Sequence, residues 1–362
     1  MRRRSRLLLW LVLLVLAAWE PARAEPYLAV QTGAKCVACH VNPTGGGLRN
    51  AAGVVYAQRV LPAHQWPESW PDWGGSLGER LRVGGDLRTG SVRTTVPGQA
   101  PQQVGGLKQF RIYADFELVA QSLAVYVDET VAPGTAARQE AYVRAAVPGT
   151  GWYAKAGQFY LPFGWRLQDN SAIVRQLSGI SMTAPDKGLE LGLELDGWSA
   201  QWTYTGGAAN VGTVSGRQMS GQIVSLRDWG RVGVAALSTR STSGDRQAVG
   251  IFGGTRTGPL AWLFEVDLVR DAGFPEGRRN LAATLAEVNW RVAQGHNLKL
   301  SAELLDPDRR IQHDHKLRQS VVYEYSPLPY LQLRAGWRRH LGIPQNNFDN
   351  RQQKFIELHG LF

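Results

Sequence analysis

Apolar and polar residues alternate with a period of two along most of the chain. In residues 108–118, every second position from Phe110 to Leu118 is apolar, and the positions between them carry Gln, Arg, Tyr, Asp and Glu. The same alternation recurs in residues 260–268, 296–304 and 329–338. Successive side chains of a β-strand point to opposite faces, so each segment is predicted to be a strand with one apolar and one polar face.

Sixteen such segments are predicted, and an even number is expected for a bacterial single-chain transmembrane barrel. Each has about ten residues, the length that a tilted strand needs to cross a bilayer. The predicted strands are residues 79–92, 107–119, 123–132, 137–147, 151–160, 186–196, 198–207, 216–227, 230–241, 245–256, 259–271, 279–292, 296–306, 314–326, 329–340 and 351–362.

The connections between these strands differ systematically in length. Every second connection is short, near residues 121–122, 148–150, 197, 229, 257–258, 294–295 and 327–328. The other connections include long loops near 93–106, 161–185 and 341–350. Short periplasmic turns and longer external loops are typical of outer-membrane barrels, and a water-soluble β-sandwich would not show this asymmetry. We therefore predict an all-β, antiparallel transmembrane barrel over residues 75–362, surrounded by outer-membrane lipid.

The first 24 residues have the pattern of a secretory signal peptide. Four arginines precede the apolar run 7–18, and Ala22-Arg23-Ala24 provides a cleavage site before Glu25. The run is too short to cross a bilayer unaided. The formal net charge of +10 includes the arginines of this signal, and no basic face with RNA-binding motifs is present, so no nucleic-acid partner is expected.

The only two cysteines, Cys36 and Cys39, lie in the sequence Cys36-Val37-Ala38-Cys39-His40. C-x-x-C-H is the attachment pattern of c-type haem: the two thiols bond the vinyl groups of one porphyrin, and the histidine binds its iron. We therefore expect one covalent haem c, with His40 as the proximal ligand. Two alternatives are a thiol–disulfide redox pair and half of a zinc site, for which the distant His313 and His315 are poor partners.

The residues around the motif predict a short helical segment. Residues 42–47 form turns, and Asn50 can cap a helix from Ala51 to about Leu61. A Pro- and Trp-rich linker then leads to the barrel, so residues 25–74 are predicted to be the haem segment and linker. The sixth ligand of the iron is left open: the candidates are His64 first, His359 second, then Met182, Met219 or no side chain.

A haem segment ahead of a porin-like barrel resembles the fused outer-membrane cytochrome–porin family of iron-oxidising bacteria. The residues that carry the resemblance are Gln31-Thr32-Gly33, the motif 36–40, and the barrel that ends at Phe362. The resemblance implies a haem segment inside the barrel that conducts electrons between an outside donor and periplasmic carriers. Residues 157–164 also resemble a segment of phosphate-selective porins, and in sixteen-stranded porins the third external loop, here 161–185, folds inward. An ordinary surface loop is the alternative for 161–185.

Three functions are compatible with these patterns. The first is electron transfer between periplasmic cytochromes or other redox carriers and an external electron donor or acceptor, without a conventional substrate pocket. The second is a porin-type solute channel whose haem segment is a plug or sensor. The third is a haem enzyme such as a peroxidase, which would need an open sixth position and a distal acid–base pair that the sequence does not identify.

Overall fold

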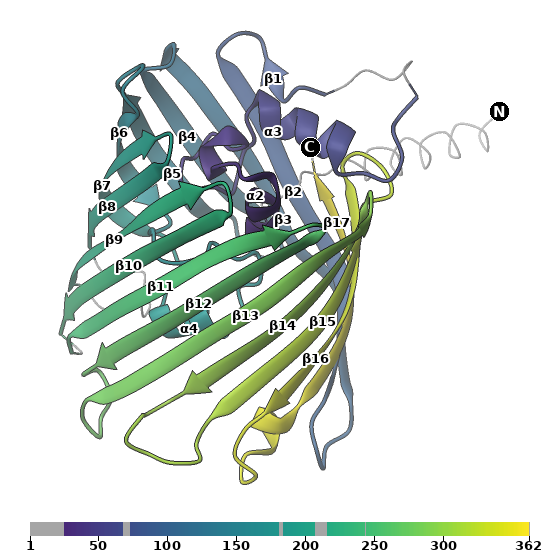
Figure 1. The fold of residues 1–362 in the computed structure, drawn as a ribbon, viewed down its shortest axis with the longest axis vertical. Helices are drawn as coiled ribbons and strands as arrows, with labels where there is room; N and C mark the ends of the chain where they lie inside the picture. Colours follow the sequence, from purple (N-terminus) through teal and green to yellow (C-terminus); the bar gives the residue numbers. More distant parts are fainter. Residues whose placement is uncertain (1–24, 68–72, 181–183, 207–215, 243, 362) are drawn as a thin grey trace.

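The computed structural model describes residues 25–67, 73–180, 184–206, 216–242 and 244–361. Within these ranges, the sixteen strands β2 to β17 form one closed antiparallel barrel (Figure 1). Their bounds are β2 Leu81–Thr95, β3 Gln102–Val119, β4 Leu123–Ala132, β5 Ala137–Ala146, β6 Trp152–Phe159, β7 Asp186–Leu195, β8 Trp198–Thr205, β9 Gly216–Arg227, β10 Gly230–Ser241, β11 Arg246–Thr257, β12 Leu260–Asp271, β13 Arg279–Ala293, β14 His296–Asp306, β15 Lys316–Tyr325, β16 Leu331–Leu341 and β17 Gln352–Leu361. A short strand, β1 (Ser76–Leu77), pairs with the start of β2.

The barrel closes because its last strand pairs with its first. Each strand pairs with its neighbour in sequence, and β17 pairs with β2 from Gln352 opposite Thr95 to Leu361 opposite Asp86. Closure satisfies the backbone N–H and C=O groups of every strand, which hydrocarbon cannot hydrogen-bond. The predicted fold class is thus confirmed.

The strand boundaries differ most from the prediction at the β2–β3 hairpin. The predicted long loop at 93–106 is wrong, because paired strand continues to Thr95 and resumes at Gln102. Residues 102–107 are exposed on both faces of β3. A hairpin that is solvent-exposed on both faces needs no alternation of apolar and polar residues, so the periodicity of the sequence could not reveal these strand extensions.

The wall of the barrel is apolar outside and polar inside. On β12, Trp262, Phe264 and Val266 point outward and are about 40% exposed, whereas Glu265 and Asp267 point inward and are fully buried. An apolar exterior of this kind is what a strand in contact with lipid requires, and it places the barrel in the outer membrane. No helix within the described ranges is long and apolar enough to span a membrane.

The lumen is filled from one end by residues 25–67, called here the plug segment. It contains α2 (Pro26–Thr32), η1 (Cys36–Ala38), α3 (Ala51–Val55) and η2 (Tyr56–Val60). Figure 1 shows α2 enclosed by the strands and α3 at one mouth of the barrel. The plug segment bonds to the short turns, for example Ala63 N–H to Ser326 O (2.8 Å). It therefore lies at the periplasmic end. The predicted helix over 51–61 is present and capped by Asn50, although its last turn is a π-helix.

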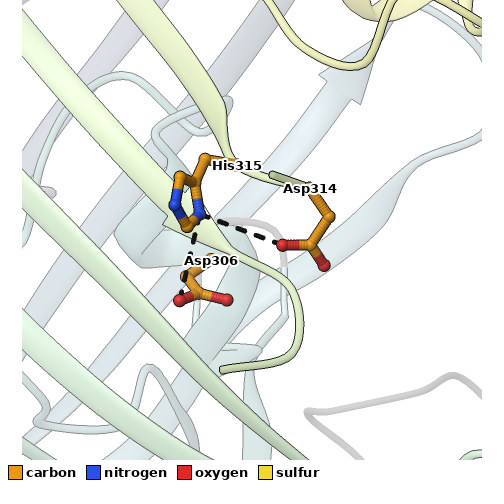
Figure 2. Close-up of side chains that lie close together, drawn as sticks. All are labelled: Asp306, Asp314 and His315. Atoms are coloured by element: carbon orange, nitrogen blue, oxygen red, sulfur yellow. Dashed lines mark ion pairs between the residues drawn. The ribbon is translucent and has the colours of Figure 1, made fainter. Parts of the chain in front are cut away.

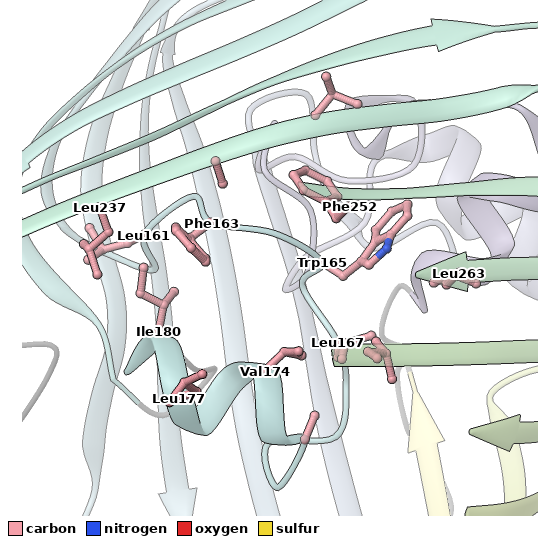
Figure 3. Packing of buried hydrophobic residues seen from close by; sticks show 14 of the residues in the cluster. Leu161, Phe163, Trp165, Leu167, Val174, Leu177, Ile180, Leu237, Phe252 and Leu263 are labelled. Atoms are coloured by element: carbon pink, nitrogen blue, oxygen red, sulfur yellow. The ribbon is translucent and has the colours of Figure 1, made fainter. Parts of the chain in front are cut away.

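Residues 160–180, called here the inward loop, fill the lumen from the external side. The loop carries α4 (Ile173–Ser178), which packs against β12, β13 and β14. Phe163, Trp165 and Val174 are buried with Leu237 and Phe252 of the wall (Figure 3). The Trp165 and Phe252 rings meet edge to face, with centroids 5.4 Å apart. The predicted inward folding of this loop is therefore confirmed.

A charge on the lipid face tests the orientation of the wall. Val266→Arg places a guanidinium near the middle of β12, where it would cost about 2–4 kcal/mol of folding free energy in a bilayer. Gln247→Arg, at the external end of β11, should cost about 0–1 kcal/mol and is the matched control. Denaturant unfolding in lipid vesicles measures both. Equal costs at the two positions would contradict the assignment of the lipid face.

Candidate functional site

Helix α2 sets the direction in which the chain approaches the motif. Pro26 occupies its first turn, where the missing N–H removes no helical bond, and Gly33 ends it with φ of 71°. The Thr32 hydroxyl donates to Leu28 O (2.7 Å) in the last turn. After this left-handed residue the chain continues to Lys35 and Cys36, which line a cavity in the lumen.

Ion pairs and hydrogen bonds from the wall hold both ends of α2. The Glu25 carboxylate pairs with Lys299 of β14 (2.9 Å). Arg231 of β10 donates to the carbonyl oxygens of Ala29 (2.7 Å) and Ala34 (2.6 Å). These contacts join residues that are 197 to 274 positions apart in the sequence, so the position of α2 depends on the completed barrel.

The two cysteines lie in one tight turn, with His40 directly behind it. Cys39 N–H donates to Cys36 O (3.1 Å), and His40 N–H donates to the same oxygen (3.0 Å). Asn50 stabilises the turn with two hydrogen bonds: its side chain donates to Val37 O (2.9 Å), and its backbone N–H donates to Cys39 O (3.1 Å). The structure therefore brings Cys36, Cys39 and His40 together as the sequence motif predicted.

Three consecutive glycines fold the chain back over this turn. Gly45, Gly46 and Gly47 have φ of 84°, 73° and 62°, a region that side chains disfavour. A Cβ atom on Gly45 would lie 3.2 Å from the Cys36 Sγ atom. The run therefore provides both the reversal and the close approach to the thiol.

Asn42, which lies between the motif and the three glycines, binds the plug segment to the barrel wall. Its side chain donates to Glu140 of β5 (3.2 Å) and accepts from Lys155 of β6 (2.8 Å). Lys155 also pairs with Glu190 of β7 (2.8 Å), and all four side chains are fully buried or nearly so. Buried charges need partners of this quality, so the network fixes the plug segment in one position. Sequence analysis missed it, although Lys155 and Glu190 both occupy lumen-facing positions of predicted strands.

A cavity lies between the plug segment and the inward loop. Cys36, Cys39 and His40 line it together with Phe163, Trp165 and other side chains of the loop and the wall. Its empty volume is about 1370 Å³, including the opening to solvent. Ligand sites in proteins are concave and mostly apolar. The two thiols and the imidazole of the motif thus border a concave space that aromatic and aliphatic side chains also line.

His40 is suited to bind a metal. It is 2% exposed, and its Nδ1 atom is buried without a hydrogen bond of regular geometry. Burial, followed by the charges of Arg49 and Arg166, lowers the pKa of His40 to about 3. The imidazole is therefore neutral at physiological pH, which is the form that coordinates a metal. Two thiols at the required spacing, a neutral histidine and an adjacent cavity fit a covalent haem c.

The proposed sixth ligands do not line this cavity. His64 is exposed, and its backbone N–H bonds to Pro327 O at the periplasmic turn after β15. His359 is buried, but it lines a separate small cavity and contacts Asp86 and Gln332. Met219 points outward and is 48% exposed. Met182 lies outside the described residues. The structure therefore lends no support to His64, His359 or Met219 as the distal ligand.

The two alternative chemistries of the motif find little support in the geometry. A thiol–disulfide pair relies on a thiol of lowered pKa at the start of a helix, whereas burial raises the pKa of both Cys36 and Cys39. For zinc, the expected partner region is remote. His315 lies close to Asp314 and to Asp306, the last residue of β14 (Figure 2). This group is at the external end of the barrel, whereas the cysteines belong to the plug segment at the periplasmic end.

Comparisons with known proteins support a porin-type barrel. The chain is similar to an anion-selective porin from Comamonas acidovorans, with a TM-score of 0.59 and 11% identity over 78% of this chain and 99% of that one. It is also similar to the outer-membrane channel DcaP of Acinetobacter baumannii, with a TM-score of 0.58 and 12% identity over 78% of this chain and 97% of that one. A third similar structure is OprB of Pseudomonas putida, with a TM-score of 0.59 and 8% identity over 78% of this chain and 94% of that one. No protein-family profile and no curated protein matches. At these identities the likeness concerns the fold, and the names of these three proteins mention no haem.

Gly53 tests how the motif is positioned. A Cβ atom there would collide with the Cys39 carbonyl oxygen, so Gly53→Ala should displace α3 from the cysteine turn and destabilise the plug segment by about 1–3 kcal/mol. Gly74→Ala is the control, because no atom lies near its Cβ position. Hydrogen exchange of the plug segment should rise in the first variant alone. Unchanged protection in Gly53→Ala would show that α3 does not support the motif.

Proposed function

We propose that this chain is an outer-membrane electron-transfer protein that carries one covalent haem c inside its barrel. The observation that supports the proposal most is the position of Cys36, Cys39 and His40. They lie on the wall of a lumenal cavity between the plug segment and the inward loop. A porin-type barrel needs no such motif to conduct solutes, whereas a haem held at this place would lie inside the barrel.

Each residue of the motif has a defined task in this proposal. Cys36 and Cys39 would hold the porphyrin through thioether bonds, and His40 would hold its iron. When bound, the haem supplies a one-electron carrier whose potential is set by its ligands, its burial and the charges around it. Asn42 and the glycines 45–47 keep the cysteine turn against the wall, so the geometry does not depend on the cofactor alone.

The two ends of the barrel would serve different partners. Ala38, between the two cysteines, is exposed at the periplasmic end, where a periplasmic cytochrome or another soluble carrier could approach. On the other side, the inward loop separates the cavity from the external medium. An external donor or acceptor would therefore exchange electrons across this loop, and neither partner needs to enter a substrate pocket.

A solute channel is the second candidate, and the similar solved structures favour it. They include an anion-selective porin and an outer-membrane channel. In this chain, however, hydrogen bonds and an ion pair bind the plug segment to β5, β6, β10 and β14. The inward loop is also held, because Asp169 pairs with Arg318 (3.1 Å) and Arg338 (2.8 Å) of the wall. A channel function would therefore require one of these two segments to move.

Electron transfer across liposomes tests the first candidate. The purified protein should reduce a trapped dye from an external reductant, and Cys36→Ser/Cys39→Ser should reduce this rate to that of empty liposomes, because the carrier is lost. His64→Ala, a change at an exposed histidine of the same segment, should leave the rate unchanged. A rate that survives loss of both thiols would contradict electron transfer through the haem.

Conductance in planar bilayers distinguishes the channel. We expect near-silent wild-type protein, and steadier, larger openings in Asp169→Asn, since the change weakens the anchor of the inward loop by about 1–2 kcal/mol. Asp306→Asn, at the external end but outside the inward loop, is the control. A large steady conductance of the wild-type protein would instead support the solute channel.

A further inference from the structure

The charges that line the cavity are paired, with two exceptions. Arg166 pairs with Glu140 (3.1 Å) and Arg175 with Glu265, Lys35 pairs with Glu194 (3.4 Å), and Glu25 pairs with Lys299 (2.9 Å). The two remaining charged residues are Arg49 and Arg231. Among the described residues, neither has a carboxylate within ion-pair distance.

Arg231 is a buried cation in an otherwise apolar stretch of the wall. It is 5% exposed, and its guanidinium donates to the backbone carbonyls of Ala29 and Ala34. Carbonyl oxygens satisfy hydrogen bonds but do not neutralise a full charge. A buried charge without a counter-charge is costly, so its retention at this position calls for an anion nearby.

Arg49 also belongs to the plug segment, and its backbone forms an isolated antiparallel bridge with that of His40. Burial lowers the pKa of Arg49 to about 10, which leaves it charged at neutral pH. The carboxylate of Asp86 is near enough to influence it but makes its own contacts with Arg88 (3.4 Å) and His359 (3.7 Å). Two uncompensated positive charges therefore border the same cavity, one from the plug segment and one from the wall.

We propose that Arg49 and Arg231 are the counter-charges of the two carboxylates of the haem, and that they raise its reduction potential. This inference rests on the proposed function, because it takes haem as the occupant of the cavity. A haem brings two propionate carboxylates, which equals the number of unpaired cations. Once they enter, every charge that lines the cavity has a partner. The pairing also explains why the cavity keeps two arginines in an environment of low dielectric, where charges interact strongly.

The test measures the midpoint potential of the purified holoprotein in Arg49→Gln and Arg231→Gln. Loss of a positive charge near the haem favours the ferric form. At a fixed ambient potential the ratio of reduced to oxidised haem should therefore fall roughly threefold or more in each variant, which is about 28 mV for a one-electron couple. Arg49→Lys and Arg231→Lys keep the charge and should stay close to wild type. Unchanged potentials in both glutamine variants, with full haem content, would overturn the proposal.

Arg256→Gln is the matched control. Arg256 of β11 also donates to the plug segment, at Gln31 O (2.9 Å), but it does not line the cavity, so its loss should leave the potential unchanged. A shift of equal size in this variant would mean that loosening the plug segment, and not the charge, is responsible, and would overturn the proposal.

Haem content and anion dependence cover the remaining outcomes. If the glutamine variants fold as barrels but lose haem while the lysine variants keep it, the charge requirement is supported. If the lysine variants lose haem as well, it is refuted. A potential that varies with phosphate concentration at constant ionic strength, in an arginine-dependent way, would show that a soluble anion is the partner instead. Absence of haem from the wild-type protein would refute the proposed function itself.

Discussion

A barrel of sixteen strands encloses more space than its own lumenal side chains can fill, and this constraint shapes the rest of the molecule. Small barrels pack their interiors with side chains, whereas sixteen-stranded ones leave a channel unless other segments enter. Here the plug segment enters from the periplasmic end and the inward loop from the external end. The cavity beside Cys36, Cys39 and His40 is the space that remains between them.

The polar inner face makes this filling specific. Lumenal residues such as Lys155 and Glu190 are buried once the plug segment is in place. They form an ion pair with each other, and Lys155 also donates to Asn42. Asp169 plays the same part for the inward loop. Because a buried charge without a partner is expensive, one arrangement of the plug segment is preferred over many loosely packed ones. The wall thereby holds the cysteine turn in one position.

The sequence allowed the wall to be predicted almost strand by strand, because lipid on one face and water or polar groups on the other impose a period of two. The prediction was wrong at residues 93–106. There β2 and β3 continue as a paired hairpin whose residues 102–107 are exposed on both faces, so no period of two is imposed on the sequence. The haem prediction for residues 36–40 rests on the spacing of the motif and stays a prediction, whereas the structure adds the tight turn that holds Cys36, Cys39 and His40 together. The partners of Asn42, and the absence of His64 and His359 from the cavity lining, depend on contacts between segments far apart in sequence, which no local pattern encodes.

The central claim is that Cys36 and Cys39 carry a porphyrin. Intact-mass measurement of the protein purified from the outer membrane of a host that matures c-type cytochromes, after treatment with a thiol alkylator, tests it most directly. We expect a mature chain heavier by one haem, with neither cysteine alkylated. A mature chain without the added mass of a haem, whose only added mass is that of two alkyl groups on the cysteines, would contradict it and would leave a porin-type barrel with a filled lumen.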